Sequence, residues 1–230
     1  MLVNGEPVAL DAYVDRIDVI IEAFEGGQAA GTAFARIVFG EVSPSGVMPF
    51  TTYPAEFVNQ IAMDNYDMRA GPGLTYRFYK EKATFPFGHG ESYVNWEQKW
   101  GPSSAMPATA QSVEILRGEG IVFPVVVTNT GLPVGATYGG RFTSAAKVVQ
   151  MFLKITKGHD GVPPLKTLVA MEKVWVDRGQ SAHVSLNTSA IAGTCAFCVV
   201  SATGESSISV GNEYVVELGV DGSDPYTISV

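Results

Sequence analysis

The feature that most constrains the fold is a change of sequence pattern near the middle of the chain. Residues 1–98 mix helix-like stretches with many turns, whereas residues 111–230 consist of short β-type runs separated by Gly, Pro, Asn and Asp. Residues 99–110 are rich in Pro and small side chains and have no hydrophobic periodicity, which is typical of a linker. The sequence therefore predicts two domains, and the total of 230 residues has room for two small ones.

In the first part, apolar residues recur at helical spacing over residues 28–39 and predict a helix that ends at Gly40. Gly31 inside this helix is costly unless a neighbouring backbone packs closely against it, so we expect such a neighbour. A second helix is predicted over residues 13–24, after a buried strand that ends at Leu2 and Val3. A strand followed by packed helices predicts an α/β layer arrangement.

The second part contains seven β-type runs, at residues 112–118, 121–131, 147–155, 165–176, 182–188, 195–200 and 212–220. Several alternate apolar and polar residues, as Val149, Met151 and Leu153 do with Gln150 and Lys154. Short strands with frequent turn signals predict a β-sandwich of the immunoglobulin or fibronectin type III kind. Because Pro124 has no N–H to donate, we expect it to face away from the strand ladder or to sit at a bulge.

Charge and hydropathy exclude several classes of partner. A net charge of −8 opposes binding to nucleic acid or to an anionic membrane surface. The longest apolar run, residues 121–127, is too short to span a membrane and is interrupted by Pro124. The start carries no basic segment before an apolar one, so no signal peptide is predicted. Because Met1 leads directly into apolar Leu2 and Val3, we expect either an intracellular protein or one whose true beginning is missing.

The two cysteines, Cys195 and Cys198, form a lone C-x-x-C pair. A structural zinc site needs four ligands, and His89, His159 and His183 lie far apart without ligand spacing. The run around the cysteines reads as a strand, where residues three apart are about 10 Å distant and too far for a disulfide. We therefore expect ordinary half-buried thiols and no metal or cofactor site.

Three ordered blocks carry a resemblance to a known family: GGQAAGTAFARIVFGEVSPSGVMPFTTYP, MDNYDMRAGPGLTYRFY and FPFGHGESY, at residues 26–54, 63–79 and 85–93. They resemble the closing part of family 3 glycoside hydrolases, the β-xylosidase and β-glucosidase group. The later runs VVVTNTG, KVVQMFLKI and PPLKTLVAMEKV are similar to the family's terminal domain. The resemblance implies that residues 1–98 end an α/β sandwich domain and that residues 111–230 form a fibronectin type III-like domain.

Three residues depart from the family pattern. Arg36 stands where the family usually has an acidic residue, and Glu91 replaces an apolar one. Leu74 occupies the place of an arginine that could pair with a carboxylate, which a leucine cannot do. These differences predict altered local contacts within the same fold. MDNYDMR and the TYRFY block favour the β-xylosidase branch.

The resemblance implies retaining hydrolysis of terminal β-linked sugars from an oligosaccharide substrate, without cofactor or metal. This chemistry needs two carboxyl groups about 5 to 5.5 Å apart. In the family, the nucleophilic Asp comes from an N-terminal barrel and the acid/base Glu from the α/β sandwich, upstream of the matching blocks. We therefore expect no catalytic residue in this chain, a scaffolding role and the missing barrel as its partner. The sequon at Asn187 is consistent with a secreted parent enzyme.

The carboxylates in the first part have simpler interpretations than catalysis. Glu6 follows the opening strand, at an edge where open α/β sheets bind ligands, but a solvated loop acid is the simpler expectation. Asp64 and Asp67 are expected to accept backbone hydrogen bonds in turns or to pair with Arg69. Two further acids, Glu22 and Glu25, are expected on an exposed helix face.

Aromatic side chains gather between residues 66 and 96 and leave two alternatives open: Tyr66, Tyr76, Phe78, Tyr79, Phe85, Phe87, Tyr93 and Trp96. They can fill the seam between two packed domains, as aromatic residues often do. They can also form a platform on which sugar rings stack. The second alternative predicts a non-catalytic carbohydrate-binding or interaction module.

Overall fold

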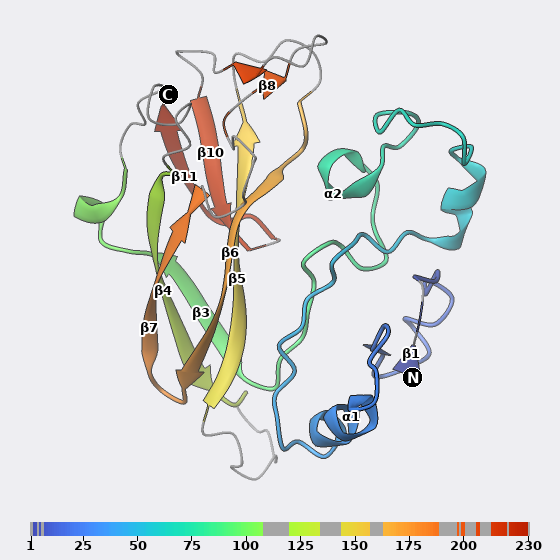
Figure 1. The fold of residues 1–230 in the computed structure, drawn as a ribbon, viewed down its shortest axis with the longest axis horizontal. Helices are drawn as coiled ribbons and strands as arrows, with labels where there is room; N and C mark the ends of the chain where they lie inside the picture. The colour runs from blue at the N-terminus through green and yellow to red at the C-terminus, as the bar shows by residue number, and fades with distance from the viewer. Residues whose placement is uncertain are drawn as a thin grey trace. The chain divides into compact units, whose positions relative to one another are not determined.

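The computed structural model describes residues 2–3, 5, 7–107, 120–133, 144–156, 163–188, 197, 199–200, 206–207, 213–219 and 221–229. These residues fall into two compact units, of which the first ends at Tyr93 and the second begins at Val94 (Figure 1). We call them unit 1 and unit 2. The architecture is mixed α/β with mostly β-sheets, which agrees with the predicted fold class of an α/β part followed by a β-rich part.

Unit 1 begins with a small parallel sheet. Strand β1 (Leu2–Val3) pairs with β2 (Ile21–Glu22), so the predicted strand at Leu2 and Val3 is present. The predicted helix over residues 13–24 is wrong. Only one helical turn forms, in which the carbonyl of Tyr13 accepts a hydrogen bond from the Arg16 N–H. The β-branched run at residues 19–21 fits a strand better than a helix, and its pairing with β1 could not be read from local spacing.

The predicted helix at residues 28–39 is confirmed as α1 (Ala30–Val38). Gly40 ends it in a left-handed conformation with φ of +67°, as the sequence predicted. Among the described residues outside this helix, the expected close neighbour of Gly31 is absent, because none of their atoms lies within 4 Å of the place where a Cβ would be. Two short elements complete unit 1, a 3₁₀ turn at Ala55–Asn59 and helix α2 (Thr75–Phe78).

Unit 2 is built from two antiparallel sheets. The three-stranded sheet has the order β3-β4-β7, with β3 at Asn95–Trp100, β4 at Val122–Gly131 and β7 at Ser181–Asn187. The four-stranded sheet has the order β11-β10-β5-β6, with β5 at Ser144–Ile155, β6 at Thr167–Asp177, β10 at Glu213–Leu218 and β11 at Ser223–Ser229. A 3₁₀ turn at Ser103–Ala105 and a short pair, β8 (Val199–Val200) with β9 (Ser206–Ser207), complete the described elements.

The two sheets of unit 2 share one apolar core. Alternate residues of β4 point into it, so Phe123, Val125 and Val127 are fully buried while their neighbours are more exposed. In β5, Val149, Met151 and Leu153 join the same core with strands of both sheets, as their spacing predicted. The predicted contrast with Gln150 is wrong, because Gln150 and Phe152 between them are buried as well. Full burial of side chains of this size stabilises a fold by about 1.5 to 3 kcal/mol each. This core holds unit 2 together.

Pro124 lies in the central strand β4, opposite Ser185 of β7. Its carbonyl accepts a hydrogen bond from the N–H of Gly101, just beyond the end of β3 at Trp100. A strand residue directs its N–H and C=O to the same side, so the missing donor of Pro124 falls where the β3 ladder has ended. The prediction that this proline avoids the ladder is therefore confirmed.

The predicted linker is wrong at its start. Residues 99 and 100 belong to β3, whose residues Trp96 and Trp100 pack against the core of unit 2. The compact units accordingly separate near residue 94, before the predicted boundary. Strand β11 was also not predicted. The run at 112–118 lies outside the described residues, and of the run at 195–200 the structure describes Phe197 in a turn and the strand Val199–Val200.

Candidate functional site

The family-like blocks of unit 1 bind one another through buried polar contacts. The Ser43 hydroxyl lies 3.0 Å from the Ser92 hydroxyl and accepts a hydrogen bond of 3.0 Å from the Tyr93 N–H. Met48 donates its N–H to the carbonyl of His89 at 2.7 Å. These hydrogen bonds hold the P-S-G turn and the F-G-H-G segment together. The sequence identified the two only as separate motifs.

A second set of close contacts surrounds the turn before α2. Gly73 has φ of +90°, and a Cβ there would overlap the Phe78 carbonyl oxygen, so only glycine fits. Thr75 has φ of +58°, a strained conformation for a β-branched residue. Its N–H donates to the Tyr53 hydroxyl at 2.6 Å, and burial raises the pKa of Tyr53. Tyr53 lies in the family-like block at residues 26–54, but nothing in the sequence identified it as the partner of this turn.

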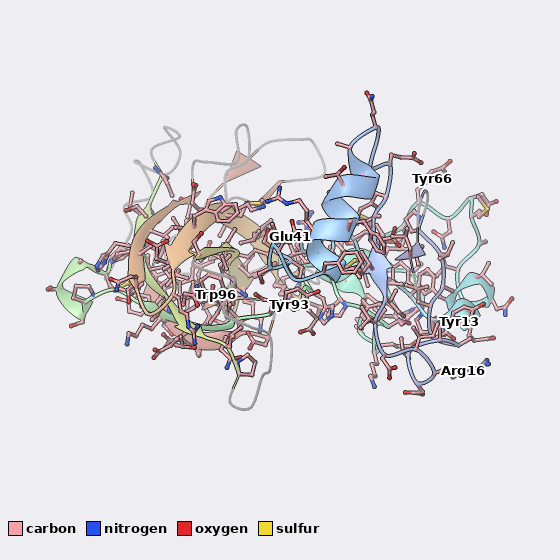
Figure 2. All side chains as sticks on the ribbon, turned by 90° about the horizontal axis from the view of Figure 1, so that it is seen from below. Tyr13, Arg16, Glu41, Tyr66, Tyr93 and Trp96 are labelled. Carbon is pink, nitrogen blue, oxygen red and sulfur yellow. The ribbon has the colours of Figure 1, made fainter. Side chains whose placement is uncertain are left out.

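The aromatic residues are packed pairs rather than one exposed cluster. Tyr76 stacks on Phe87 with ring centroids 4.2 Å apart, and Tyr79 is buried edge-on to Tyr53 at 4.9 Å. Tyr66 is the exception, with 91% of its surface exposed. Figure 2 shows Tyr66 and Tyr93 at separate places on unit 1. The platform that the sequence allowed is therefore not assembled from these residues, while the seam alternative stays a prediction.

Phe78 is buried beneath two cations. The guanidinium carbons of Arg69 and Arg77 lie 4.9 Å and 5.7 Å from its ring centroid. Cation–π contacts of this kind contribute about 0.5 to 1 kcal/mol at exposed sites. At the position where the family has an arginine, Leu74 is extended and half-buried, and its N–H donates to the Met68 carbonyl. The loss of an arginine here leaves two other arginines close to the turn.

Two of the candidate carboxylates accept backbone hydrogen bonds, one in a turn and one at the end of a strand. Asp67 accepts a hydrogen bond from the Arg69 N–H at 2.9 Å, which confirms the predicted turn chemistry. Asp64 is exposed in the same loop. The expected helix face for Glu22 and Glu25 is wrong, because Glu22 lies in β2 and accepts from the Phe24 N–H at 3.2 Å. Glu6 lies outside the described residues.

The other two departures from the family pattern find local partners. Arg36 lies 3.6 Å from Glu41 just beyond α1, and both side chains are about half exposed. Glu91 lies 3.7 Å from His89. An exposed ion pair such as that of Arg36 with Glu41 contributes about 0 to 1 kcal/mol. They are local adjustments of the surface.

Unit 2 holds a buried charge that the sequence did not indicate. Glu217 of β10 is 6% exposed, and its Oε1 accepts a 2.6 Å hydrogen bond from Lys154 of the neighbouring strand. The Lys166 Nζ lies over the Phe152 ring, 4.5 Å from its centroid. Burial lowers the pKa of Lys166, and the nearby Glu217 carboxylate opposes that shift. The charge-assisted hydrogen bond between Lys154 and Glu217 joins β5 to β10 in the four-stranded sheet.

The described residues contain neither a cluster of metal-ligand side chains nor a helix long and apolar enough to span a membrane. Within those residues, His, Cys, Asp and Glu side chains do not come together in groups of three or more that could hold a metal ion. None of the described helices combines the length and the apolar character that crossing a bilayer requires. Cys195, Cys198 and His159 lie outside the described residues, so the expected state of the thiols stays a prediction.

Comparison with known sequences identifies relatives across most of the chain. Residues 1–93 match the glycosyl hydrolase family 3 C-terminal domain. The probable exo-1,4-β-xylosidase bxlB of Aspergillus fumigatus is 33% identical over 186 residues, which cover 76% of this chain and 23% of that enzyme. The β-D-xylosidase 1 of Arabidopsis thaliana is 31% identical over 207 residues, covering 83% of this chain and 27% of that enzyme. The chain thus spans about a quarter of the length of these relatives.

Comparison with solved structures extends the likeness of fold to the whole chain. A family 3 exo-β-xylosidase in complex with a xylobiose aziridine activity-based probe matches with a TM-score of 0.78 and 19% identity, covering 99% of this chain and 30% of that one. A family 3 β-glucosidase of Bifidobacterium adolescentis matches with a TM-score of 0.75 and 23% identity, covering 100% and 32%.

These matches confirm the family resemblance that the three ordered blocks carry. Gly73 and Ser92, which lie within the family-like motifs, take part in the contacts described above. Residues 1–93 belong to the C-terminal domain of family 3 glycosyl hydrolases, and the chain as a whole corresponds to the C-terminal part of that family's β-xylosidases and β-glucosidases.

Proposed function

We propose that this chain is the C-terminal scaffolding portion of a retaining β-glycosidase, and that both catalytic carboxylates lie in parts of the enzyme outside it. Its task is to complete the α/β sandwich layer that carries the acid/base residue and to support that layer against the barrel. The reaction of the whole enzyme is then hydrolysis of terminal β-linked sugars from oligosaccharides, which depends on a fixed separation between two carboxyl groups.

The observation that carries this proposal is coverage. The chain spans 23% of the fungal relative and 27% of the plant relative, and its own family match is to a C-terminal domain. The contacts of its acidic side chains support the same conclusion. Asp67 and Glu22 serve turns and strand ends, and Glu217 is clamped by Lys154.

We further propose that unit 2 is a fibronectin type III-like domain. Its three-stranded and four-stranded sheets support this, since they enclose one core in the manner of immunoglobulin-like sandwiches. The strand β6 joins the sheet of β5 and β10 rather than the sheet of β4 and β7. This arrangement differs from the immunoglobulin constant type, in which the fourth strand joins the other sheet.

The substrate class and the location of the enzyme belong to the same proposal. The named curated relatives are β-xylosidases, which supports xylose-containing oligosaccharides as the substrate of the complete enzyme. We propose a secreted parent enzyme, for which the sequon at Asn187 is the supporting feature. Loss of mass on treatment of the secreted protein with an N-glycosidase, absent in Asn187→Gln, is the expected result.

A covalent chimera tests the scaffolding role. The chain is fused in frame in place of the matching C-terminal part of the Aspergillus fumigatus relative, and hydrolysis of an aryl β-xyloside is measured. We expect turnover by the chimera and none by that relative truncated at the same point. A soluble, folded chimera without activity would contradict the proposal.

A second candidate is a carbohydrate-binding module, which two exposed aromatic side chains favour. Trp175 on β6 is 61% exposed, and Tyr66 in unit 1 is almost fully exposed. Sugar faces stack on such rings. Saturable binding to xylan that is lost in Trp175→Ala or Tyr66→Ala would support this function, and absence of binding by the unaltered chain would remove it.

A further inference from the structure

Strand β6 lies at one edge of the four-stranded sheet of unit 2. Among the described residues it forms a ladder with β5 alone, and it is 11 residues long. An edge strand presents backbone groups that can pair with a strand of another chain, and natural proteins ordinarily keep such strands short or place charges on them. Because β6 is long, its side chains decide which strand could pair with it.

The side chains in the last part of β6 alternate between the core and the solvent. Val176 is buried, and Val174 packs against the core of unit 2. The residues that alternate with them, Lys173, Trp175 and Asp177, are exposed, and Trp175 has 61% of its surface exposed. Alternate strand residues point to the same face, so these three lie in one row on the outer face of the sheet. The row holds a cation, a large ring and a carboxylate at equal spacing.

The charges of the run E-K-V-W-V-D-R, which begins at Glu172, have opposite order on the two sides of Trp175. When two copies lie antiparallel with their Trp175 residues opposite each other, Lys173 of each copy meets Asp177 of the other. Glu172 likewise meets Arg178, and the valines between them meet each other. Directly opposed residues of an antiparallel pair have Cβ atoms about 4.5 to 5.5 Å apart, and opposite charges at that distance stabilise the pairing. The segment is therefore complementary to itself.

Neighbouring symmetrical registers lack this match. A register centred on Lys173 or on Glu172 places two like charges directly opposite each other, which is destabilising. In a register centred on Val174 or on Val176, none of these charges meets an opposite charge. Charges on an edge strand ordinarily prevent pairing, whereas the order of charges in β6 favours one register with a second copy.

We propose that two copies of this chain associate through β6, with the strands antiparallel and Trp175 at the twofold axis. The two four-stranded sheets then form one continuous sheet. Such a contact uses the same surface on both copies, so it closes as a dimer. The Val176 carbonyl already accepts a hydrogen bond from Asn129, and its second lone pair can accept one from the other copy. This inference is independent of the proposed function.

The overall charge of the chain opposes this dimer only weakly. Each copy carries a net charge of −8, but exposed charges more than about 8 to 10 Å apart are largely screened at physiological ionic strength. The pairs of Lys173 with Asp177 lie on directly opposed positions, within that distance. The local attraction between the strands is therefore screened less than the repulsion between the two whole chains.

Sedimentation velocity of the full chain over a range of concentrations tests the proposal. We expect a reversible equilibrium between monomer and dimer. Lys173→Asp places two carboxylates opposite each other at both ends of the paired segment, and it is expected to weaken the dimer by about tenfold or more. Lys99→Asp is the matched control, because it changes the net charge equally on β3, an edge strand of the other sheet. We expect it to change the dimer affinity by less than about twofold.

A mixture of two variants makes the test specific for this register. Asp177→Lys is expected to weaken the dimer as Lys173→Asp does. When the two variants are mixed, each altered side chain faces an opposite charge on the other chain. We therefore expect a one-to-one heterodimer whose affinity lies within about threefold of that of the unaltered chain. A variant that failed to fold would not be rescued in this way, and circular dichroism confirms that each fold is retained.

The remaining outcomes overturn the proposal. A chain that stays monomeric at its highest soluble concentration would show that β6 does not pair with a second copy. A dimer that Lys173→Asp leaves unchanged, or single variants that mixing fails to rescue, would show that the copies associate elsewhere or in another register. Saturable xylan binding by a monomeric chain that Trp175→Ala abolishes would assign this face to carbohydrate instead.

Discussion

The two units of this chain are stabilised by different kinds of interaction. Unit 2 buries large side chains from both sheets, among them Phe123, Phe152 and Tyr214, in or around one apolar core. In unit 1 the described buried apolar side chains are Val3, Leu10, Phe78 and Tyr79. Its shape depends instead on turns, glycines and buried hydroxyls. The comparison teaches that a unit held by an apolar core and a unit held mainly by turns and hydrogen bonds can lie on one chain.

Limited proteolysis of the full chain should show the largest difference between the units. Few apolar side chains are buried in unit 1, so its backbone opens locally at low free-energy cost. We expect the first cuts before Val94 and a persistent fragment that begins near that residue. Mass spectrometry of the products locates the cuts. Equal resistance of both units would show that unit 1 is a complete domain, contrary to our account.

A pair of matched phenylalanine substitutions should sharpen the comparison. Phe123→Ala removes a fully buried ring from the core of unit 2 and is expected to destabilise the fold by about 3 to 5 kcal/mol. Phe39→Ala removes a mostly exposed ring from unit 1 and should change the unfolding free energy by less than about 0.5 kcal/mol. Urea unfolding followed by far-ultraviolet circular dichroism, which reports on the backbone of both units, measures both. Similar losses for the two variants would mean that Phe39 is packed in solution.

Asn129 connects the two sheets of unit 2 and should have an intermediate effect. Its side chain is 1% exposed, donates to the Val176 carbonyl at 3.0 Å and accepts from the Gly131 N–H at 3.0 Å. Asn129→Ala leaves both backbone groups without these partners, so a loss of about 1 to 3 kcal/mol is expected. The same unfolding assay applies, with Lys173→Ala on exposed β6 as control. An effect no larger than that of the control would contradict the sheet-connecting role.

The smallest expected effect concerns alkaline pH and unit 1. Burial raises the pKa of Tyr53 and Tyr79 above the ordinary value of 10.0, and the Glu81 charge contributes at Tyr79. Below pH 10 both the folded and unfolded states hold these protons, so stability is unaffected. Above it the unfolded state ionises first, and stability falls as pH rises through the folded pKa. Tyrosinate absorbance should show late-titrating groups, one fewer in Tyr53→Phe; an unchanged titration would refute the burial of Tyr53.

The sequence predicted those elements whose signals are local. The apolar spacing of α1 with Gly40, and the alternation in β4 and β5, identified these elements because each pattern lies within one element. It failed for residues 13–24, where pairing of β2 with β1 decides the structure. It also missed β3, because the Pro-rich and Ser-rich segment that follows has the composition of a linker.

The hydrogen bonds between the blocks of unit 1 were not predicted because they join residues far apart in sequence. The Ser43 and Ser92 hydroxyls meet across 49 positions of sequence, and Tyr53 accepts from Thr75 across 22. Residue type alone does not specify such pairings. The family resemblance identified the blocks that contain these residues, and the structure shows what they do for one another.

The activity of the isolated chain tests the central claim most directly. The purified chain is assayed with aryl β-xyloside and β-glucoside substrates. We predict no turnover, because our proposal assigns the matched nucleophile and acid to parts of the enzyme outside this chain. Turnover by the isolated chain that disappears in Asp64→Asn or Asp67→Asn would show that these polypeptide segments contain a catalytic carboxylate, and would contradict the account.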